Sequence, residues 1–239
     1  MAIVSNTVNY LHNDIALEAF FAYDTAITGR RPAVLINHAW AGRDVFVNEK
    51  AELLAGLGYV GFAVDMYGKG VLGATPEENG RLMQPFIDDR ALLLERLLAA
   101  VSAVKLLPWV DDSKIAAIGY CFGGLCVLDL ARAGVDVKGV VSFHGLLTAP
   151  KHNANKSITA KVLALHGHDD PMVPVEQVVA FEQEMTEAGA DWQVLNFGRT
   201  MHAFTNPQAN NPDFGTVYQP DTDRRSWLAM QNFLTELFF

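Results

Sequence analysis

A cysteine in a glycine-rich turn is the residue of this chain with the clearest capacity for chemistry. Cys121 stands in the sequence Ile118-Gly119-Tyr120-Cys121-Phe122-Gly123-Gly124, which follows an apolar run and begins a helical pattern. A sharp turn from a strand into a helix exposes the side chain at its tip, and it requires glycines because the helix packs closely on the strand. Since a cysteine thiolate is a strong nucleophile, we predict that Cys121 is a catalytic nucleophile.

Two polar loops downstream of Cys121 supply the partners that a nucleophile needs. Asp170 lies in the segment His166–Pro174, and His202 lies in Met201-His202-Ala203-Phe204; each segment follows an apolar run. Catalytic groups in open α/β sheets gather at the carboxyl ends of strands, where both loops would fall. Asp169 is the alternative to Asp170, and the Pro-x-Val-Pro spacing that follows favours Asp170 as the catalytic acid.

Each of these residue types has a defined task in nucleophilic catalysis. His202 would accept the thiol proton of Cys121 or form a thiolate–imidazolium pair with it, and Asp170 would orient the imidazole. The developing oxyanion needs two backbone N–H donors. We expect one from Phe122, the residue after the nucleophile, and the other from Trp40 in the loop His38–Gly42.

The elements that position these residues alternate along the chain. Short apolar runs predict buried parallel strands, helical patterns lie between them, and two extended runs around Asn13-Asp14 predict an antiparallel hairpin over Thr7–Tyr23. The predicted strands are Ala33–Asn37, Val60–Val64, Ile115–Gly119, Gly139–Phe143, Val162–His166 and Gln193–Phe197. The predicted helices are Asp44–Leu57, Glu77–Lys105, Gly123–Arg132, Val175–Ala188 and Asp221–Leu237. This alternation predicts one α/β domain over residues 1–239, with a mostly parallel, doubly wound sheet and helices on both faces.

Taken together, the chain resembles the dienelactone hydrolase family of the α/β-hydrolase superfamily. The resemblance is carried by Gly119–Gly124, Asp170-Pro171-Met172-Val173-Pro174 and His202-Ala203-Phe204, and by the order of elements from Thr7 to the C-terminus. It implies the α/β-hydrolase fold, a Cys121–His202–Asp170 triad, and hydrolysis of a lactone or ester through a thioester intermediate.

Three positions depart from the pattern of this family. Ala39 stands where the family places a glutamate that helps to generate the thiolate, and Asn206 stands where it places an arginine that holds the substrate carboxylate. A second family arginine aligns with Lys69, which cannot reproduce a planar bidentate contact. The loss of the two-arginine carboxylate clamp and the presence of Trp40 therefore predict a more apolar pocket, suited to activated aryl esters rather than to dienelactone. We expect Trp40, His38 and Lys69 to contact substrate; the alternatives are packing beside the site for His38 and Trp40, and a solvated cation for Lys69.

Two other clusters have simpler explanations. His166 and His168 with the two aspartates resemble a binuclear metal site, but the motif H-x-H-x-D-H requires a histidine where Pro171 stands. We therefore predict no metal and no cofactor. Cys126 follows Cys121 on the same helix, too close for a stabilising disulfide, and is predicted to be a core residue.

Composition restricts the partners. The formal net charge of −9 and the pI of about 5.2 argue against binding to nucleic acid or an anionic membrane. The sequence has neither a long apolar run nor a basic N-terminal leader, which predicts a cytoplasmic protein. The apolar end Leu234–Phe239 would either cap the core or form a dimer contact.

The sequence thus predicts a cofactor-independent hydrolase, a monomer or homodimer, whose substrate is a small ester or lactone. Hydrolysis of an activated phosphotriester by the same thiolate is a second possibility, because the oxyanion donors can also stabilise charge on a phosphoryl oxygen. A non-catalytic member of the fold that binds ligands or senses electrophiles is a third.

Overall fold

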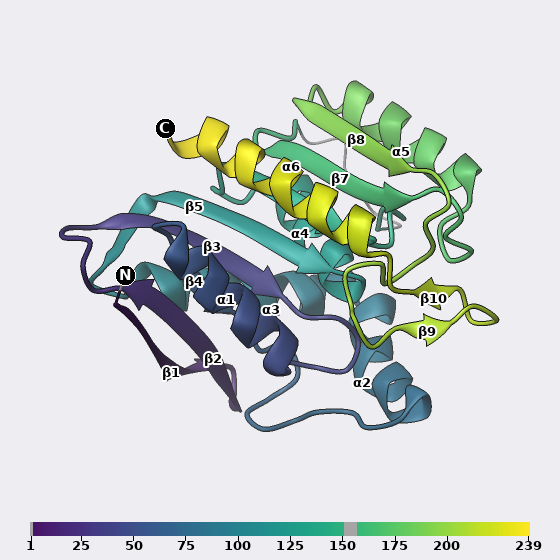
Figure 1. Cartoon of the computed structure of the whole chain (residues 1–239). Helices are drawn as coiled ribbons and strands as arrows, with labels where there is room; N and C mark the ends of the chain where they lie inside the picture. Colours follow the sequence, from purple (N-terminus) through teal and green to yellow (C-terminus); the bar gives the residue numbers. More distant parts are fainter. Residues whose placement is uncertain (1, 151–156) are drawn as a thin grey trace. The chain divides into compact units, whose positions relative to one another are not determined.

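The computed structural model describes residues 2–150 and 157–239. The chain divides into two compact units, Met1–Ile118 and Gly119–Phe239, and the boundary falls inside one strand. Figure 1 shows strands and helices alternating along most of the chain. The single domain predicted from the sequence stays a prediction, and each unit is described by itself.

The first unit begins with the predicted antiparallel hairpin. Its elements are β1 (Ile3–His12), β2 (Ile15–Asp24), β3 (Arg31–Asn37), α1 (Val45–Gly56), β4 (Val60–Ala63), α2 (Pro76–Asp88), α3 (Arg90–Lys105) and most of β5 (Val110–Tyr120). The strands β1, β2 and β4 pair antiparallel, whereas β3 pairs with β4 in parallel. Asn13, at a φ of 52°, forms the hairpin turn. Every residue of β3 and β4 is buried, as expected for parallel strands that are covered on both faces.

The second unit carries three parallel strands in the order β6-β7-β8. Its elements are α4 (Phe122–Arg132), β6 (Gly139–Phe143), β7 (Lys161–Gly167), α5 (Val175–Glu187), β8 (Trp192–Phe197), β9 (Asn210–Asn211), β10 (Thr216–Val217) and α6 (Pro220–Phe238). Helix α4 contacts β6 and is buried along its whole length. In Figure 1 α6 lies across β7, which it also contacts. Parallel strands with helical connections confirm the predicted α/β class.

The predicted helix Glu77–Lys105 is wrong as one element, because the chain breaks at Asp89. This residue has extended backbone angles, with φ −120° and ψ 92°, and its carboxylate accepts hydrogen bonds from the amides of Ala91 and Leu92, both at 3.0 Å. Asp89 therefore ends α2 and caps α3. The helical periodicity continues through the break, but an aspartate that bonds the following amides favours a new helix start.

Gln193–Phe197 is a strand, as predicted, and forms part of β8, but the prediction that this strand is buried is wrong. Strand β8 pairs only with β7 among the described strands, and Gln193, Leu195 and Asn196 are exposed. An edge strand of this kind need not be covered on both faces. At the C-terminus Phe238 is buried whereas Phe239 is exposed, so the oligomeric state stays a prediction. In the described ranges, no helix combines the length and apolarity required to cross a membrane.

Candidate active site

Cys121 occupies a strained turn between β5 and α4. Its φ of 56° and ψ of −114° lie outside the regions that non-glycine residues favour, and its amide donates to the Phe143 carbonyl at 3.0 Å. Such strain persists only when the surroundings enforce it. Cys121 is also the N-cap of α4, so the positive end of the helix dipole favours a negative charge on its sulfur. The side chain is partly accessible to solvent.

Glycines on either side of Cys121 permit this turn. A Cβ on Gly119 would lie 2.0 Å from the carbonyl oxygen of Gly123, and a Cβ on Gly124 would lie 2.6 Å from the Cα of Gly145. Both distances are far below van der Waals contact. The helix therefore approaches the strand and the β6 loop backbone to backbone, which explains why the motif needs glycine at these positions.

Asp170 is buried in the loop after β7 and has two hydrogen-bond donors. Its Oδ1 accepts from the amide of Met172 at 2.9 Å, and its Oδ2 lies 2.7 Å from Nδ1 of His202. The competing Asp169 is exposed. Of the two carboxylates, only that of Asp170 is turned toward the imidazole, which agrees with the spacing argument.

The backbone of His202 is held between neighbouring segments. Its amide donates to the Gly215 carbonyl at 2.9 Å, its carbonyl accepts from the Val217 amide at 3.0 Å, and it forms a parallel bridge with Thr216. Residues 215–217 therefore form a clamp around the His202 backbone, and Thr216 and Val217 of this clamp pair with Asn211 and Asn210 in the short β9–β10 hairpin. The sequence gives no signal for this hairpin, because two-residue strands are too short to produce a periodic pattern.

The His202 ring couples electrostatically to Cys121. Burial by itself lowers the pKa of His202, but the charge on Cys121 and the hydrogen bond to Asp170 act the other way and raise this pKa to about 10. Within the described residues, Nε2 of His202 is buried and has no hydrogen-bond partner of ordinary geometry. Catalytic hydrogen bonds are often long before substrate binds, so this atom is suited to exchange a proton with the thiol or a leaving group.

Two further histidines lie beside this group. His144 follows β6, and its ring centroid lies 5.0 Å from that of His202. His166 is the penultimate residue of β7 and is buried, and burial lowers its pKa in spite of the nearby Asp170 carboxylate. His144 was missed from the sequence, although its position at the carboxyl end of a strand is a signal that could have found it. His168 is exposed, with Nδ1 3.3 Å from the Asn196 amide nitrogen.

No metal centre is formed by these histidines and aspartates. Among the residues that the structure describes, no group of three or more His, Cys, Asp or Glu side chains is placed to hold a metal ion. Cys126 is completely buried on α4, as predicted for a core residue.

The remaining predicted site residues lie in the first unit. His38 Nε2 accepts from the Met66 amide at 3.3 Å, and Nδ1 lies 2.6 Å from the Ala39 carbonyl oxygen. Burial lowers the pKa of His38 to about 4. Both ring nitrogens thus serve the local backbone, which favours the packing role over substrate contact.

Lys69 and Trp40 also have local contacts. The Lys69 ammonium lies 2.9 Å from a carboxylate oxygen of Glu18 and donates to the Asn9 side chain, also at 2.9 Å. Trp40 is half-buried, and its carbonyl accepts from the Tyr67 hydroxyl at 3.0 Å. The contribution of the Trp40 amide to an oxyanion hole stays a prediction, as do the substrate contacts of Trp40 and Lys69.

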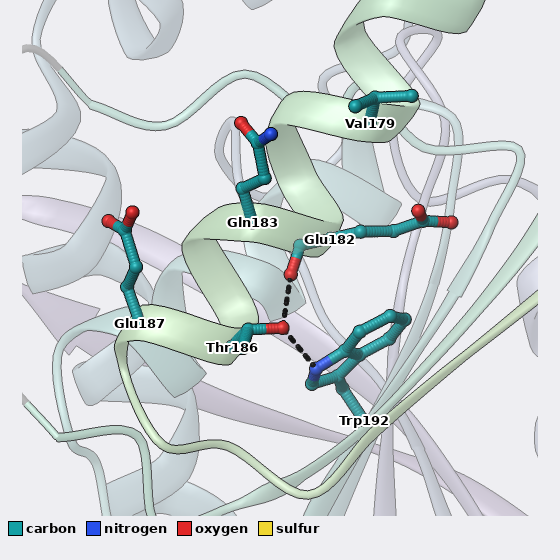
Figure 2. A pocket seen from close by; sticks show the side chains of 6 residues that line it. All are labelled: Val179, Glu182, Gln183, Thr186, Glu187 and Trp192. Atoms are coloured by element: carbon teal, nitrogen blue, oxygen red, sulfur yellow. Dashed lines mark hydrogen bonds between the residues drawn. The ribbon is translucent and has the colours of Figure 1, made fainter.

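A hollow of about 450 Å³ lies on the surface formed by α5 and the start of β8. Figure 2 shows its lining residues, Val179, Glu182, Gln183, Thr186, Glu187 and Trp192. The Trp192 ring nitrogen donates to the Thr186 hydroxyl at 3.2 Å, and that hydroxyl donates to the Glu182 carbonyl at 2.8 Å. None of Cys121, Asp170 and His202 lines this hollow, so it is not the candidate active site.

Comparison with known proteins identifies relatives over the whole chain. Residues 17–238 match the model of the Dienelactone hydrolase family. A crystal structure of a dienelactone hydrolase-like promiscuous phosphotriesterase from metagenomic libraries is 36% identical, with a TM-score of 0.94 and complete coverage of both chains. A dienelactone hydrolase from Anabaena variabilis has 19% identity, a TM-score of 0.70 and complete coverage of both chains, which shows the fold. An uncharacterised protein from Caenorhabditis elegans is 38% identical over 154 residues, 63% of this chain and 98% of its own length. The predicted α/β-hydrolase fold is confirmed.

Proposed function

Because this chain belongs to the dienelactone hydrolase family, a family of ester and lactone hydrolases, we propose that it cleaves small esters through Cys121, His202 and Asp170. The observation that carries the proposal is the buried His202–Asp170 hydrogen bond of 2.7 Å beside a cysteine in a strained turn. Family membership also favours the enzyme over the non-catalytic alternative.

The first half of the reaction forms a thioester. The thiolate of Cys121 attacks the carbonyl carbon, a C–S bond forms, and the π electrons of the carbonyl move to its oxygen. The amide of Phe122, the first residue of α4, donates to this oxyanion, since the amides of a first helical turn point beyond the helix end. As the C=O bond re-forms, the C–O bond to the leaving group breaks. The departing oxygen takes the proton from Nε2 of His202.

The second half of the reaction releases the acid. Water attacks the thioester carbon while neutral His202 takes one of its protons at Nε2, and the C–S bond breaks to regenerate the thiolate of Cys121. Asp170 accepts from Nδ1 throughout and stabilises the imidazolium that forms. One ester and one water thus give one acid and one alcohol.

Activated aryl esters are the substrate class that the residues favour. Ala39 and Asn206 supply no charge, and the Lys69 ammonium is engaged by Glu18. A substrate carboxylate would therefore have no bidentate cationic partner at these positions. A neutral ester with a good leaving group needs none.

Phosphotriesters are the second candidate, favoured by the 36% identical neighbour described as a promiscuous phosphotriesterase. The thiolate of Cys121 would attack phosphorus, and the P–O bond to the aryl group would break as the departing aryloxide takes the Nε2 proton of His202. Neutral His202 would then take a proton from water as the water oxygen attacks phosphorus, and the P–S bond would break to regenerate the thiolate. The same Phe122 amide can stabilise the charge on the phosphoryl oxygen.

Single-turnover mass spectrometry tests both candidates. Wild type, Cys121→Ser and the buried-cysteine control Cys126→Ser are mixed with p-nitrophenyl acetate or an aryl phosphotriester. We expect a transient acetyl or phosphoryl adduct on the Cys121 peptide, with turnover, in wild type and Cys126→Ser. Wild-type turnover in Cys121→Ser, or an adduct confined to Cys126, would refute the proposed mechanism.

A further inference from the structure

Backbone strain is concentrated near the candidate triad. Among the described non-glycine residues, positive φ angles occur at Asn13, Cys121, His144, Arg199 and Ala203. Cys121 is the nucleophile, Ala203 follows His202, and His144, at φ 39°, follows strand β6. Non-glycine residues persist in this conformation only where the surroundings enforce it, and such residues cluster at functional sites. His144 therefore has the backbone signature of a site residue.

The closest contacts of the His144 ring are with the His202 loop, whereas the Tyr120 ring of β5 lies farther away, with centroids 6.1 Å apart. The ring packs edge-on against His202, with centroids 5.0 Å apart and an angle of 64°, and against Phe204 at 4.9 Å and 85°. Its Nε2 lies 2.8 Å from the hydroxyl oxygen of Thr205. The residue is 3% exposed. It is thus wedged between the catalytic imidazole and the residues that follow it.

The His144 amide also has a fixed partner. It donates to the Leu165 carbonyl of β7 at 2.8 Å, one residue before His166 and in the strand that leads to the Asp170 loop. His144 therefore connects the strand that leads to the acid with the loop that carries the base. A shift of either segment would disturb the ring.

His144 cannot compete with His202 for a proton. Burial lowers the pKa of His144 well below its usual value, and the positive charge of His202 lowers it further. The other ionisable groups beside the two rings are His166, whose pKa burial also lowers, Tyr120, whose pKa burial raises well above its usual value, Asp170 and Cys121. A neutral aromatic ring can contact an imidazolium without removing its proton, whereas a second charged ring would repel it.

We propose that His144 is a positioning residue: anchored by Thr205, its ring holds the His202 imidazole with Nδ1 on Asp170 and Nε2 available to Cys121. This inference rests on the proposed Cys121–His202 pair, and it adds a residue outside the triad to that site. A phenylalanine would fill the same space, but it could not bond to Thr205, so only part of the orientation would be kept.

Two measurements on His144→Ala, His144→Phe and Thr205→Val test the proposal. The first is the pH profile of Cys121 alkylation by iodoacetamide, which reports the thiolate–imidazolium pair without any ester. The second is the separation of kcat from KM for p-nitrophenyl acetate. Misplacement of a catalytic group by 1 Å can cost about 10²-fold, so we expect His144→Ala to lower kcat by about 10- to 100-fold with KM changed by less than about threefold. Alkylation below pH 7 should fall in parallel.

The volume-conserving variants keep the test decisive if His144→Ala fails to fold. We expect His144→Phe and Thr205→Val to lie between wild type and His144→Ala in both measurements. The control Thr222→Val removes another buried hydroxyl contact of this unit, the 2.9 Å pair of Thr200 and Thr222, and should match wild type. Wild-type values in all three test variants, or equal losses in the control, would overturn the proposal. If wild type alkylates at low pH but hydrolyses no ester, the substrate class fails and the alkylation profile still decides the role of His144.

Discussion

Replacing Asp170 by asparagine exchanges one carboxylate oxygen for an NH₂ group at a site where both oxygens accept hydrogen bonds. Oδ1 accepts from the Met172 amide at 2.9 Å and Oδ2 is 2.7 Å from Nδ1 of His202. An asparagine that keeps its oxygen on the Met172 amide turns its NH₂ group toward Nδ1. The imidazole must then carry its proton on Nε2, where it can no longer accept the proton of the Cys121 thiol or of water.

The magnitude follows from this tautomer change. The same exchange in a serine protease triad lowers kcat by about 10⁴-fold. A cysteine needs less help to ionise than a serine, so we expect Asp170→Asn to lower kcat by about 10³- to 10⁴-fold, or about 4–5.5 kcal/mol of transition-state stabilisation. The lost hydrogen bond to a charged group contributes about 1.5–3 kcal/mol of that difference.

The assay is kcat for p-nitrophenyl acetate, together with the melting temperature of each variant. Asp169→Asn is the matched control, because this neighbouring carboxylate is exposed. Substitutions at such surface positions change stability by less than about 0.5 kcal/mol, and we expect kcat within about threefold of wild type. A folded Asp170→Asn enzyme within tenfold of wild type, or a larger loss in Asp169→Asn, would refute the assignment of the catalytic acid.

Three further predictions concern the charge of His202, a glycine of the elbow, and Lys69. The pKa of His202 by NMR should be near 10 in wild type and lower in Cys121→Ala, because the thiolate that raises it is gone while burial remains. Since the pKa of His202 in the folded protein lies above the ordinary 6.5, the charged ring stabilises the fold below pH 6.5, and this stabilisation is lost as the pH rises through about 10. An unchanged His202 pKa in Cys121→Ala would contradict the electrostatic coupling between Cys121 and His202. Gly119→Ala places a Cβ 2.0 Å from the carbonyl oxygen of Gly123. We expect it to lower the free energy of unfolding by about 3 kcal/mol and the Tm by about 6–12 °C. The control Gly80→Ala adds a Cβ with nothing within 4 Å and should not lower the Tm. Lys69→Met should leave kcat/KM for neutral aryl esters within about threefold of wild type, since the half-exposed salt bridge of Lys69 to Glu18 contributes little to stability. A loss of tenfold or more would place the Lys69 ammonium in the substrate site.

The elements that position the site could be predicted because their signals are local. Apolar runs and helical periodicity located β6 and β7 to within a residue. The break at Asp89 escaped because it depends on a side chain bonding the next two amides, while periodicity on either side is the same. The clamp on His202 escaped because it is formed by backbone pairing with residues 215–217, which leaves no periodic trace.

The sequence by itself determined the residue types of the site and their order along the chain: a cysteine between glycines, then an aspartate, then a histidine. These features are encoded in adjacent residues and in the strand–loop spacing. The tertiary structure alone decided the 2.7 Å contact between the Asp170 carboxylate and the His202 imidazole, and the packing of the His144 ring against His202. Hydrogen-bond and ring geometries between distant segments depend on strand register and backbone approach, to within tenths of an ångström. Residue identity and periodicity do not carry that information.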